Sequence, residues 1–373
     1  RSQLAQVLAM PEGDITVEGT EVGGAFGGKA QTRLSPICIV LSRKSGRPVR
    51  LVLTRTEVLQ ATGPGAHGVF TVKAGATKDG KIKGLQARMI YGAGAFPGAP
   101  VGIGCLCAFA PYQPDAVRVD GYDVVTNTPR VAAYRAPGAT VAVFAAESVI
   151  DEMASQIGMD PIDFRLKNIS KTGDRNTNDM EFTKLGIEEM LLQAKSHPAW
   201  TTPLEPSSNG QQRGRGMAIG WWPNGVGTSS CRITVVPNGD IQLVVGTMDL
   251  SSTRTGFVQM AADELGVPTR RVHLTTANTD GVAFTGTSGG SRVTRSMSAA
   301  IYDACQSVIA QMKEEIAPKL GVDAQFVDFE DGVFSARHVA EKSMSFEEVA
   351  KAVVEGSTSI VARASNDPNL KAA

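Results

Sequence analysis

A glycine-rich segment near the start of the chain carries the strongest chemical signal in the sequence. It runs Gly23-Gly24-Ala25-Phe26-Gly27-Gly28-Lys29-Ala30. The segment nearly satisfies the phosphate-binding pattern G-x-x-x-x-G-K-[ST], but Ala30 stands where nucleotide hydrolysis would need a magnesium-binding hydroxyl. A tight turn between a strand and a helix would account for two glycines. Four glycines around one phenylalanine favour instead a backbone that approaches a ligand closely, with N–H groups that can bind an anion.

A second loop of small residues precedes a long helix expected from Met297. It spans Gly286–Arg292 and contains Ser288, Gly289, Gly290 and Ser291. Free N–H groups and the helix dipole favour a phosphate at such a helix start, and Arg292 and Arg295 could add charge-assisted hydrogen bonds. The alternative is an ordinary capping loop with Ser291 or Ser296 as the N-cap.

A third loop, Tyr134–Gly138, places Arg135 in a Pro/Gly turn just before another expected helix. Taken alone, such an arginine is typical of a solvated surface. Three loops that each open a helix together favour one extended ligand with several anionic groups, such as a cofactor that carries a pyrophosphate.

Other kinds of catalysis find little support in the sequence. It has no G-x-S-x-G motif, and its four histidines and five cysteines show no metal-ligand spacing. Cys105 and Cys107 lie in an apolar stretch where buried thiols are expected. The pairs Asp151-Glu152 and Glu188-Glu189 are expected on solvated helix faces. Trp221-Trp222-Pro223 could either line a pocket for a flat substrate or belong to the core.

The composition is that of a folded protein without a strong charge bias. The 373 residues include 37 Lys+Arg and 37 Asp+Glu, so the net charge is zero, and 42% are apolar. This balance excludes a disordered chain and gives no support to nucleic-acid or anionic-membrane binding. No apolar run reaches the roughly 18 residues of a membrane span. We expect a cytoplasmic protein, with the periplasm as the alternative location, and a chain cut from something longer because it opens on Arg1.

Strand and helix patterns alternate along the whole chain, which favours an α+β fold with mixed α/β layers in two domains. A polar stretch before Gln211 indicates domains at 1–210 and 211–373. Strands are expected at 14–22, 47–55, 214–222 and 270–279, and hairpins at 70–96 and 231–248. Helices are expected at 34–46, 255–266, 297–317 and 345–354. A helix pair is expected at 141–167, where apolar residues that include Phe144 keep helical spacing.

A set of motifs, in this order, resembles the molybdenum-binding subunit of the xanthine dehydrogenase/aldehyde oxidoreductase family. The motifs are EVGGAFGGK, DGKIKGLQARMIYGAGAF, YRAPG, FAAESVIDEMASQIGMDPIDFRLKN, RGRGMAIG, AADELGV and TSGGSR, and the resemblance runs from Arg1 to about Ala310. It implies two molybdenum-cofactor-binding domains, the second incomplete. The metal would be held by the dithiolene of molybdopterin, with or without a cytosine dinucleotide, so that no protein metal ligands are needed. Iron–sulfur and FAD sites would lie on other domains or subunits.

The resemblance also assigns roles to individual residues. The cofactor-binding positions would be Gly24, Ala25, Phe26, Gly27, Arg135, Ser251, Ser252, Thr253, Ser288, Gly289, Gly290 and Ser291. The substrate pocket would include Ala30, Pro137 and Trp222. Phe26 and Arg135 are expected to face one cavity near the metal. The general-base glutamate of the family would lie beyond Ala373, so no catalytic residue is expected in this chain and the fragment alone should be inactive.

Three departures from the family pattern bear on the function that the resemblance implies, which is hydroxylation with water as the oxygen source. The common G-Q-G stretch appears as Asp249-Leu250-Ser251-Ser252-Thr253, apparently one residue shorter. Ala30 replaces a glutamate that binds purines, and the stretch after Arg135 lacks an aromatic residue that sandwiches them. We therefore expect an aldehyde or another small apolar or aromatic substrate. The alternative is a degenerate, cofactor-free homologue that acts as a structural subunit.

Overall fold

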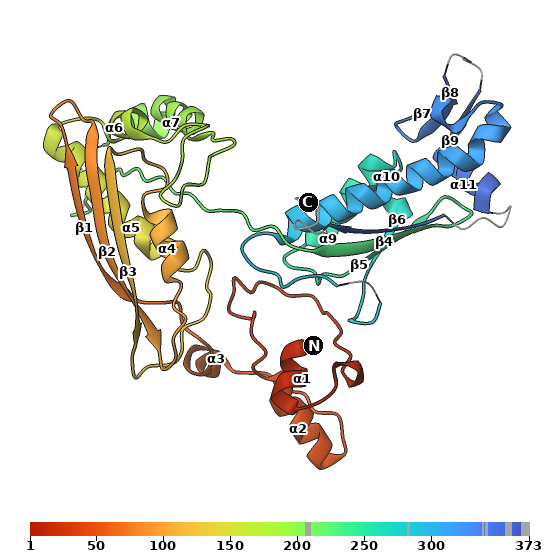
Figure 1. Cartoon of the computed structure of the whole chain (residues 1–373), viewed down its shortest axis with the longest axis horizontal. Helices are drawn as coiled ribbons and strands as arrows, with labels where there is room; N and C mark the ends of the chain where they lie inside the picture. The colour runs from red at the N-terminus through yellow and green to blue at the C-terminus, as the bar shows by residue number, and fades with distance from the viewer. Residues whose placement is uncertain (206–209, 282–283, 338, 340–341, 355–359, 367–373) are drawn as a thin grey trace. The chain divides into compact units, whose positions relative to one another are not determined.

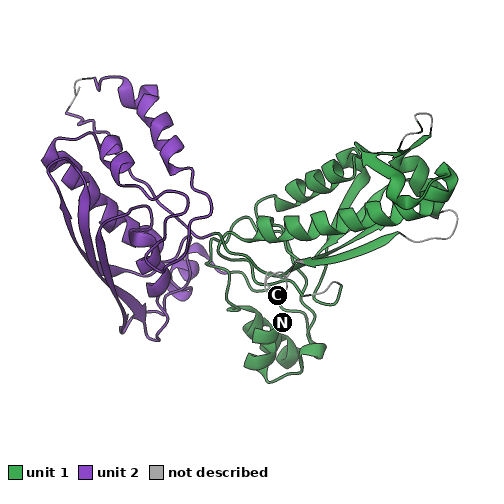
Figure 2. Ribbon diagram, turned by 45° about the horizontal axis from the view of Figure 1, so that its top comes forward, with its two compact units in different colours: residues 1–52, 224–373 green, residues 53–223 purple. Residues whose placement is uncertain are grey.

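A computed structural model describes the chain except for residues 206–209, 282–283, 338, 340–341, 355–359 and 367–373 (Figure 1). The chain divides into two compact units, residues 1–52 with 224–373 and residues 53–223 (Figure 2). The α+β fold is confirmed. The division at 210/211 stays a prediction, because the compact units group residues by contact rather than by segments of sequence. Among the described residues, no helix is long and apolar enough to span a membrane.

The unit formed by residues 53–223 is built on a three-stranded sheet in the order β1-β2-β3. β1 (Gly68–Ala76) and β2 (Ile82–Gly94) form an antiparallel hairpin, and its turn contains Gly80 in the left-handed region, as the sequence predicts. β3 (Ala116–Val125) pairs in parallel with β2. The crossover between them contains α4 (Val101–Ala108), which packs against the sheet.

α5 (Ala139–Ile157) and α6 (Pro161–Asn168) confirm the expected helix pair. Gly158 ends α5 in a left-handed conformation, and the Asp160 carboxylate accepts from the first N–H groups of α6. The buried stripe of α5 consists of Ala142, Ala146, Ile150 and Ala154, and it shares one core with buried residues of β2. Phe144, expected on the apolar face, is 75% exposed. The remaining helices of this unit are α3 (Arg55–Ala61), α7 (Ile187–Ser196) and α8 (Pro198–Thr201).

A buried charge cluster joins α5 to α6. The guanidinium of Arg165 is fully buried and donates to Glu147 Oε2 (Nη2, 2.8 Å) and Asp151 Oδ1 (Nη1, 2.7 Å). Glu147 also accepts from the Tyr112 hydroxyl and from the N–H of Ile219. Burial raises the pKa of Tyr112 well above its usual value, so its hydroxyl stays protonated and donates. Asp151 is therefore an ion-pair partner and not the solvated carboxylate expected from the sequence.

We predict that Arg165→Met lowers the free energy of unfolding of this unit by about 3–5 kcal/mol, because Glu147 would be left as a buried charge without its partner. All three tryptophans, Trp200, Trp221 and Trp222, lie in residues 53–223. Urea unfolding followed by tryptophan fluorescence therefore reports on this unit. Arg175→Met, which removes an exposed arginine, is the control and should change the free energy by less than about 1 kcal/mol. Equal effects of the two substitutions would contradict the prediction.

The other unit, residues 1–52 and 224–373, contains a four-stranded sheet in the order β10-β4-β5-β6. Its strands are β4 (Ser229–Val235), β5 (Ile241–Val245), β6 (Val272–Thr276) and β10 (Val361–Asn366). The helices α9 (Thr253–Glu264) and α10 (Val293–Leu320) share one core with it. A small sheet of β7 (Val327–Glu330), β8 (Val333–Ala336) and β9 (Ser343–Ser345) and helix α11 (Phe346–Val354) continue that core. α1 (Ser2–Leu8) and α2 (Ser35–Ser45) precede the sheet in sequence.

Three expected strands are not formed as strands. Residues 14–22, 47–55 and 214–222 have no regular ladder, and residue 55 begins α3. The first segment makes a single bridge, between Val22 and Leu250. The third segment, residues 214–222, is held by the N–H of Ile219, which donates to the buried Glu147 carboxylate. Alternation of side chains identified extended backbone at these places, but strand formation also needs a partner edge that the sequence pattern does not reveal.

Candidate functional site

Three segments singled out in the sequence meet at one end of the four-stranded sheet. They are the glycine-rich loop, the stretch Asp249–Thr253 and the loop Gly286–Arg292. β5 and β6 are parallel, with Val245 opposite Thr276, so their carboxyl ends lie at the same edge. β4 begins at this edge because Cys231 pairs with Val245 in an antiparallel register. The N–H of Gly286 donates to Thr228 O over 2.9 Å, which brings the loop before α10 to the same place. The N-termini of α9 and α10 therefore both point toward this end of the sheet.

The glycine-rich loop starts from the same edge. The N–H of Val22 donates to Asp249 O over 2.9 Å, and Val22 O accepts from Ser251 N over 3.4 Å. This parallel bridge fixes the backbone just before Gly23 against the stretch Asp249–Thr253. The structure thus brings together the predicted residues Gly24, Ala25, Phe26 and Gly27 with Ser251, Ser252 and Thr253.

Left-handed backbone at non-glycine residues is concentrated in these loops. φ is +53° at Phe26, +54° at Ser251, +71° at Ser252 and +60° at Ser291. Ala136, next to Arg135, has φ +54°, so five of the eight such residues in the described chain lie in or beside the predicted site. Each left-handed non-glycine residue costs about 1–3 kcal/mol, and such residues cluster at ligand-binding sites. Strain at these positions supports a binding role for the loops.

Three glycines of the predicted site have a positive φ that favours glycine, and Gly27 is one of them at +97°. Gly24 has φ +129°, and a Cβ there would lie 2.8 Å from the Phe26 ring. Gly290 has φ +61° and accepts through its carbonyl oxygen from Gly225 N over 2.9 Å. The Phe26 side chain is 54% exposed. An exposed aromatic ring on strained backbone is a surface suited to contact a flat group.

Arg292 shapes the loop before α10 through contacts with backbone atoms. Its guanidinium donates to Thr287 O from Nε (2.8 Å) and Nη2. It also packs on the backbone of Gly225, Gly227 and Gly286, where an added Cβ would lie 2.5–3.3 Å from Arg292 atoms. These contacts give Arg292 a structural role, and phosphate contacts of Arg292 and Arg295 stay predictions.

The helix that follows this loop starts earlier than expected. α10 begins at Val293, and its N-cap is Arg292, without a side-chain capping bond. Ser296 lies inside the helix, and its hydroxyl accepts from Gly227 N over 3.1 Å. Neither Ser291 nor Ser296 is thus the N-cap. Because no side chain caps the first turn of α10 in the described structure, its N–H groups are available to an anion.

The start of α9 differs because a carboxylate already lies there. Asp249 Oδ1 accepts from Thr253 Oγ1 (3.2 Å) and from Arg254 N (3.4 Å). Thr253 Oγ1 in turn accepts from Leu250 N over 3.3 Å. A negative charge at a helix N-terminus is favourable, so Asp249 stabilises α9 itself. The hydroxyls of Ser251 and Ser252 are the better candidates for contact with a ligand, since the Thr253 hydrogen is committed to Asp249.

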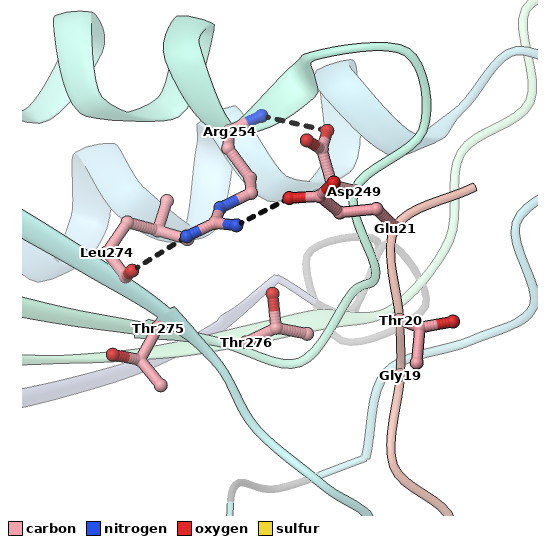
Figure 3. A pocket seen from close by; sticks show the side chains of 8 residues that line it. All are labelled: Gly19, Thr20, Glu21, Asp249, Arg254, Leu274, Thr275 and Thr276. Carbon is pink, nitrogen blue, oxygen red and sulfur yellow. Dashed lines mark hydrogen bonds and ion pairs between the residues drawn. The ribbon is translucent and has the colours of Figure 1, made fainter. Parts of the chain in front are cut away.

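An open cleft of about 320 Å³ lies beside this loop (Figure 3). It is lined by Gly19, Thr20, Glu21, Asp249, Arg254, Leu274, Thr275 and Thr276. The Arg254 guanidinium contacts Glu21 Oε1 (3.4 Å) and donates to Leu274 O (3.3 Å). Arg254 therefore ties the segment that enters the glycine-rich loop to β6 and α9. Sequence analysis missed Arg254 and Glu21, and nothing in their separation by 233 positions signals that they meet.

We predict that Arg254→Met loosens the glycine-rich loop without unfolding the unit. The Arg254 side chain is 41% exposed, so its ion pair contributes at most about 1 kcal/mol to stability. Hydrogen–deuterium exchange should rise several-fold in residues 21–30 and stay unchanged in residues 296–317. Arg254→Lys keeps the charge but loses the planar fork of donors. Hydrogen–deuterium exchange in residues 21–30 of this variant should be intermediate. Unchanged exchange at residues 21–30 in Arg254→Met would show that another contact positions the loop.

The other predicted site residues belong to the unit formed by residues 53–223. Arg135 and Pro137 lie in the turn before α5, where Gly138 has φ +76° and accepts from the Tyr91 hydroxyl over 3.0 Å. Trp222 is half-buried, next to Trp221, whose ring meets Phe182 edge-on. The two units are described separately, so the expectation that Phe26 and Arg135 face one cavity stays a prediction.

The thiols do not form a candidate site. Burial raises the pKa of Cys107 to about 11 and those of Cys231 and Cys305 to about 12. These groups stay protonated and unreactive near neutral pH. The described residues contain no cluster of three histidines, cysteines, aspartates or glutamates that could hold a metal ion.

Comparison of the sequence with known protein families identifies the family to which the chain belongs. Two models described as "molybdopterin cofactor-binding domain" match residues 1–169 and 193–372. The chain belongs to this family, and the expected relationship to molybdenum-binding subunits of the xanthine dehydrogenase/aldehyde oxidoreductase type is confirmed.

Individual relatives agree with this assignment. The chain is 28% identical over 337 residues to a probable xanthine dehydrogenase subunit of Bacillus subtilis, covering 87% of this chain and 45% of the relative. It is 30% identical over 302 residues to the xanthine dehydrogenase molybdenum-binding subunit of Escherichia coli O157:H7, covering 76% of this chain and 40% of the relative. The chain thus spans less than half the length of these relatives.

A solved structure shares the fold. Quinoline 2-oxidoreductase from Pseudomonas putida 86 superposes with a TM-score of 0.83 at 24% sequence identity. The superposition covers 98% of this chain and 51% of that protein. This chain therefore shares the fold of the matched part of that protein.

The loops at the sheet end fit molybdopterin, which combines a flat heterocycle with a phosphate. A Cβ at Gly23 or Gly289 would meet no atom within 4 Å, so both glycines border open space. The uncapped start of α10 offers N–H groups for the phosphate. The backbone of Gly24 to Gly27 and the exposed Phe26 ring could lie against a flat group. The chemistry of these residues suits the cofactor of the family.

Proposed function

We propose that this chain forms the cofactor-binding part of a molybdenum hydroxylase, an oxidoreductase that oxidises an aldehyde or a heterocycle with water as the oxygen source. The observation that carries the proposal is the convergence of the glycine-rich loop, Ser251–Thr253 and Ser288–Ser291 at one end of a sheet, with strained backbone in all three. The family assignment and the relatives support it. A general base would come from outside this chain.

The bound cofactor would supply the two-electron oxidation chemistry, and residues of this chain would hold and orient it. N–H groups at the start of α10 would neutralise its phosphate, with Ser288, Gly289, Gly290 and Ser291 forming the surrounding loop. Ser251, Ser252 and Thr253 would replace the amide that the family places in this stretch. Phe26 would lie beside the metal, and Arg135 near the metal and the substrate.

The substrate side is proposed from the departures at Ala30 and after Arg135. A methyl group at position 30 cannot hydrogen-bond a purine, and the turn Arg135–Gly138 has no aromatic side chain to stack on one. An aldehyde or a small aromatic substrate is therefore favoured, with Ala30, Pro137 and Trp222 lining the pocket. Iron–sulfur and FAD domains or subunits would receive the electrons, in the cytoplasm.

A matched pair of glycine substitutions tests the proposal in the full-length protein purified from its native host. Gly289→Leu has room for its side chain and no positive φ, but the side chain would fill the space before the loop. We expect at least a tenfold loss of bound molybdenum and pterin with an unchanged melting temperature. Gly214→Leu, also with no atom within 4 Å of a Cβ, should retain both. Equal retention by the two variants would contradict the proposed site.

The same measurement separates the alternative, a cofactor-free structural subunit. That alternative gains some support from the way Asp249 and Thr253 satisfy one another within the altered stretch. Wild-type protein that folds but contains neither molybdenum nor pterin would favour it. Stoichiometric cofactor would remove it, and a substrate screen with an artificial electron acceptor would then identify the reaction.

A further inference from the structure

Tyr91 places a hydroxyl group inside the apolar core of residues 53–223. Its side chain on β2 is fully buried, and its ring meets the Phe70 ring edge-on with 5.0 Å between the ring centres. The hydroxyl donates to Gly138 O over 3.0 Å. A phenylalanine would fill the same space without burying a polar group, and a buried hydroxyl is costly unless it is hydrogen-bonded. The acceptor on Gly138 is therefore what gives the hydroxyl its purpose.

The helix α4 leaves room for this hydrogen bond. Helices α4 and α5 lie on the same face of the β1–β3 sheet (Figure 1). A Cβ at Gly104 would lie 2.0 Å from the Tyr91 hydroxyl oxygen and 3.0 Å from Gly138 O, and a Cβ at Gly138 would lie 2.3 Å from Pro100 O. Backbone without side chains thus surrounds the phenol oxygen. Burial raises the pKa of Tyr91 well above its usual range, so the hydroxyl stays protonated and donates.

The acceptor belongs to the turn that contains Arg135. Gly138 is the N-cap of α5, without a side-chain capping bond, and its carbonyl oxygen also accepts from Ala142 N over 3.3 Å. Ala136 in the same turn has φ +54°. A left-handed non-glycine residue costs free energy and persists only where the surrounding structure holds it. The Tyr91 hydroxyl supplies such a contact from the core, three positions along the chain from Arg135.

We propose that Tyr91 is a positioning residue, which holds the Gly138 carbonyl and thereby fixes the turn that presents the Arg135 guanidinium to the substrate and the cofactor. The role of Arg135 in the reaction rests on the proposed function, whereas the contact of Tyr91 with the turn does not. Because Tyr91 is fully buried, it acts through Arg135 and not by contact with the substrate. A displacement of about 1 Å can lower a catalytic rate by about a hundredfold, so the loss of this one supporting hydrogen bond should be measurable.

Hydrogen–deuterium exchange tests the contact with the turn in the full-length protein. Tyr91→Phe removes only the hydroxyl, and exchange should rise several-fold in residues 134–142 and stay unchanged in residues 148–156 of α5. Ser170→Ala is the matched control, because the buried Ser170 hydroxyl also donates to a backbone carbonyl, Ala110 O, over 3.0 Å. It should leave exchange in residues 134–142 unchanged, and a cooperative melting transition establishes that both variants fold. Wild-type exchange at residues 134–142 in Tyr91→Phe would overturn the proposal.

A double-mutant cycle tests the action through Arg135 in the cofactor-loaded enzyme. Rates are measured in single turnovers with benzaldehyde, an aldehyde of the proposed substrate class, and are normalised to bound molybdenum so that slow variants stay measurable. Tyr91→Phe should lower the rate about tenfold, and Ser170→Ala should leave it unchanged. In an Arg135→Met background, Tyr91→Phe should lower the rate by less than about twofold, because the group that it positions is already absent. An equal factor in both backgrounds is the result of a merely structural role and would overturn the proposal.

Failure of the proposed function gives a different pattern from failure of the positioning role. Wild-type protein without molybdenum, or loaded protein that oxidises neither benzaldehyde nor any other aldehyde or heterocycle in the substrate screen, would refute the proposed function and with it the role given to Arg135. The exchange experiment would still show whether Tyr91 holds the turn, since it needs neither cofactor nor substrate.

Discussion

The parallel pairing of β5 and β6 is the constraint on which the candidate site depends. Parallel strands present their carboxyl ends at one edge, and ligands of α/β sheets bind at such edges. Here the edge also receives the start of β4 and, through Val22, the glycine-rich loop. Segments that are more than two hundred positions apart in sequence thereby supply one surface. Two helices begin there, so backbone N–H groups are concentrated where an anionic cofactor would need them.

The strained backbone of this surface is held in place by the core and by arginine hydrogen bonds. Left-handed residues such as Phe26 and Ser251 cost free energy that the large core under α10 must offset. Arg292 holds one loop by donating to Thr287 O, and Arg254 holds the entry to another by bridging Glu21 and Leu274 O. Both guanidiniums donate to backbone carbonyl oxygens, and Arg254 also lines the cleft beside the glycine-rich loop. The two guanidiniums hold the loop backbone in position, and we expect that backbone to contact a ligand.

The sequence predicted the elements whose signals are local. The hairpin turned at Gly80, the helix ends at Gly158 and Asp160, and the long helix after the Ser288–Ser291 loop all formed. Failures arose where the outcome depends on distant partners. Segment 14–22 alternates like a strand but forms a β-bridge at Val22 and no regular ladder. Phe144 follows a helical period but lies on the exposed side. The pairing of Asp151 with Arg165 was likewise invisible, because a carboxylate on a helix looks solvated until its partner is placed.

The two helices that begin at the sheet edge differ in how well their N-termini could bind an anion. At α9 the Asp249 carboxylate already accepts from the N–H of Arg254, and its negative charge would repel a second anion. At α10 no side chain caps the first turn, and the preceding loop consists of small residues. A phosphate is therefore favoured at α10, while the neutral hydroxyls of Ser251 and Ser252 near α9 suit an uncharged, hydrogen-bonding part of the cofactor. The altered stretch then changes which part of the ligand this loop can contact, and it leaves the anion site intact.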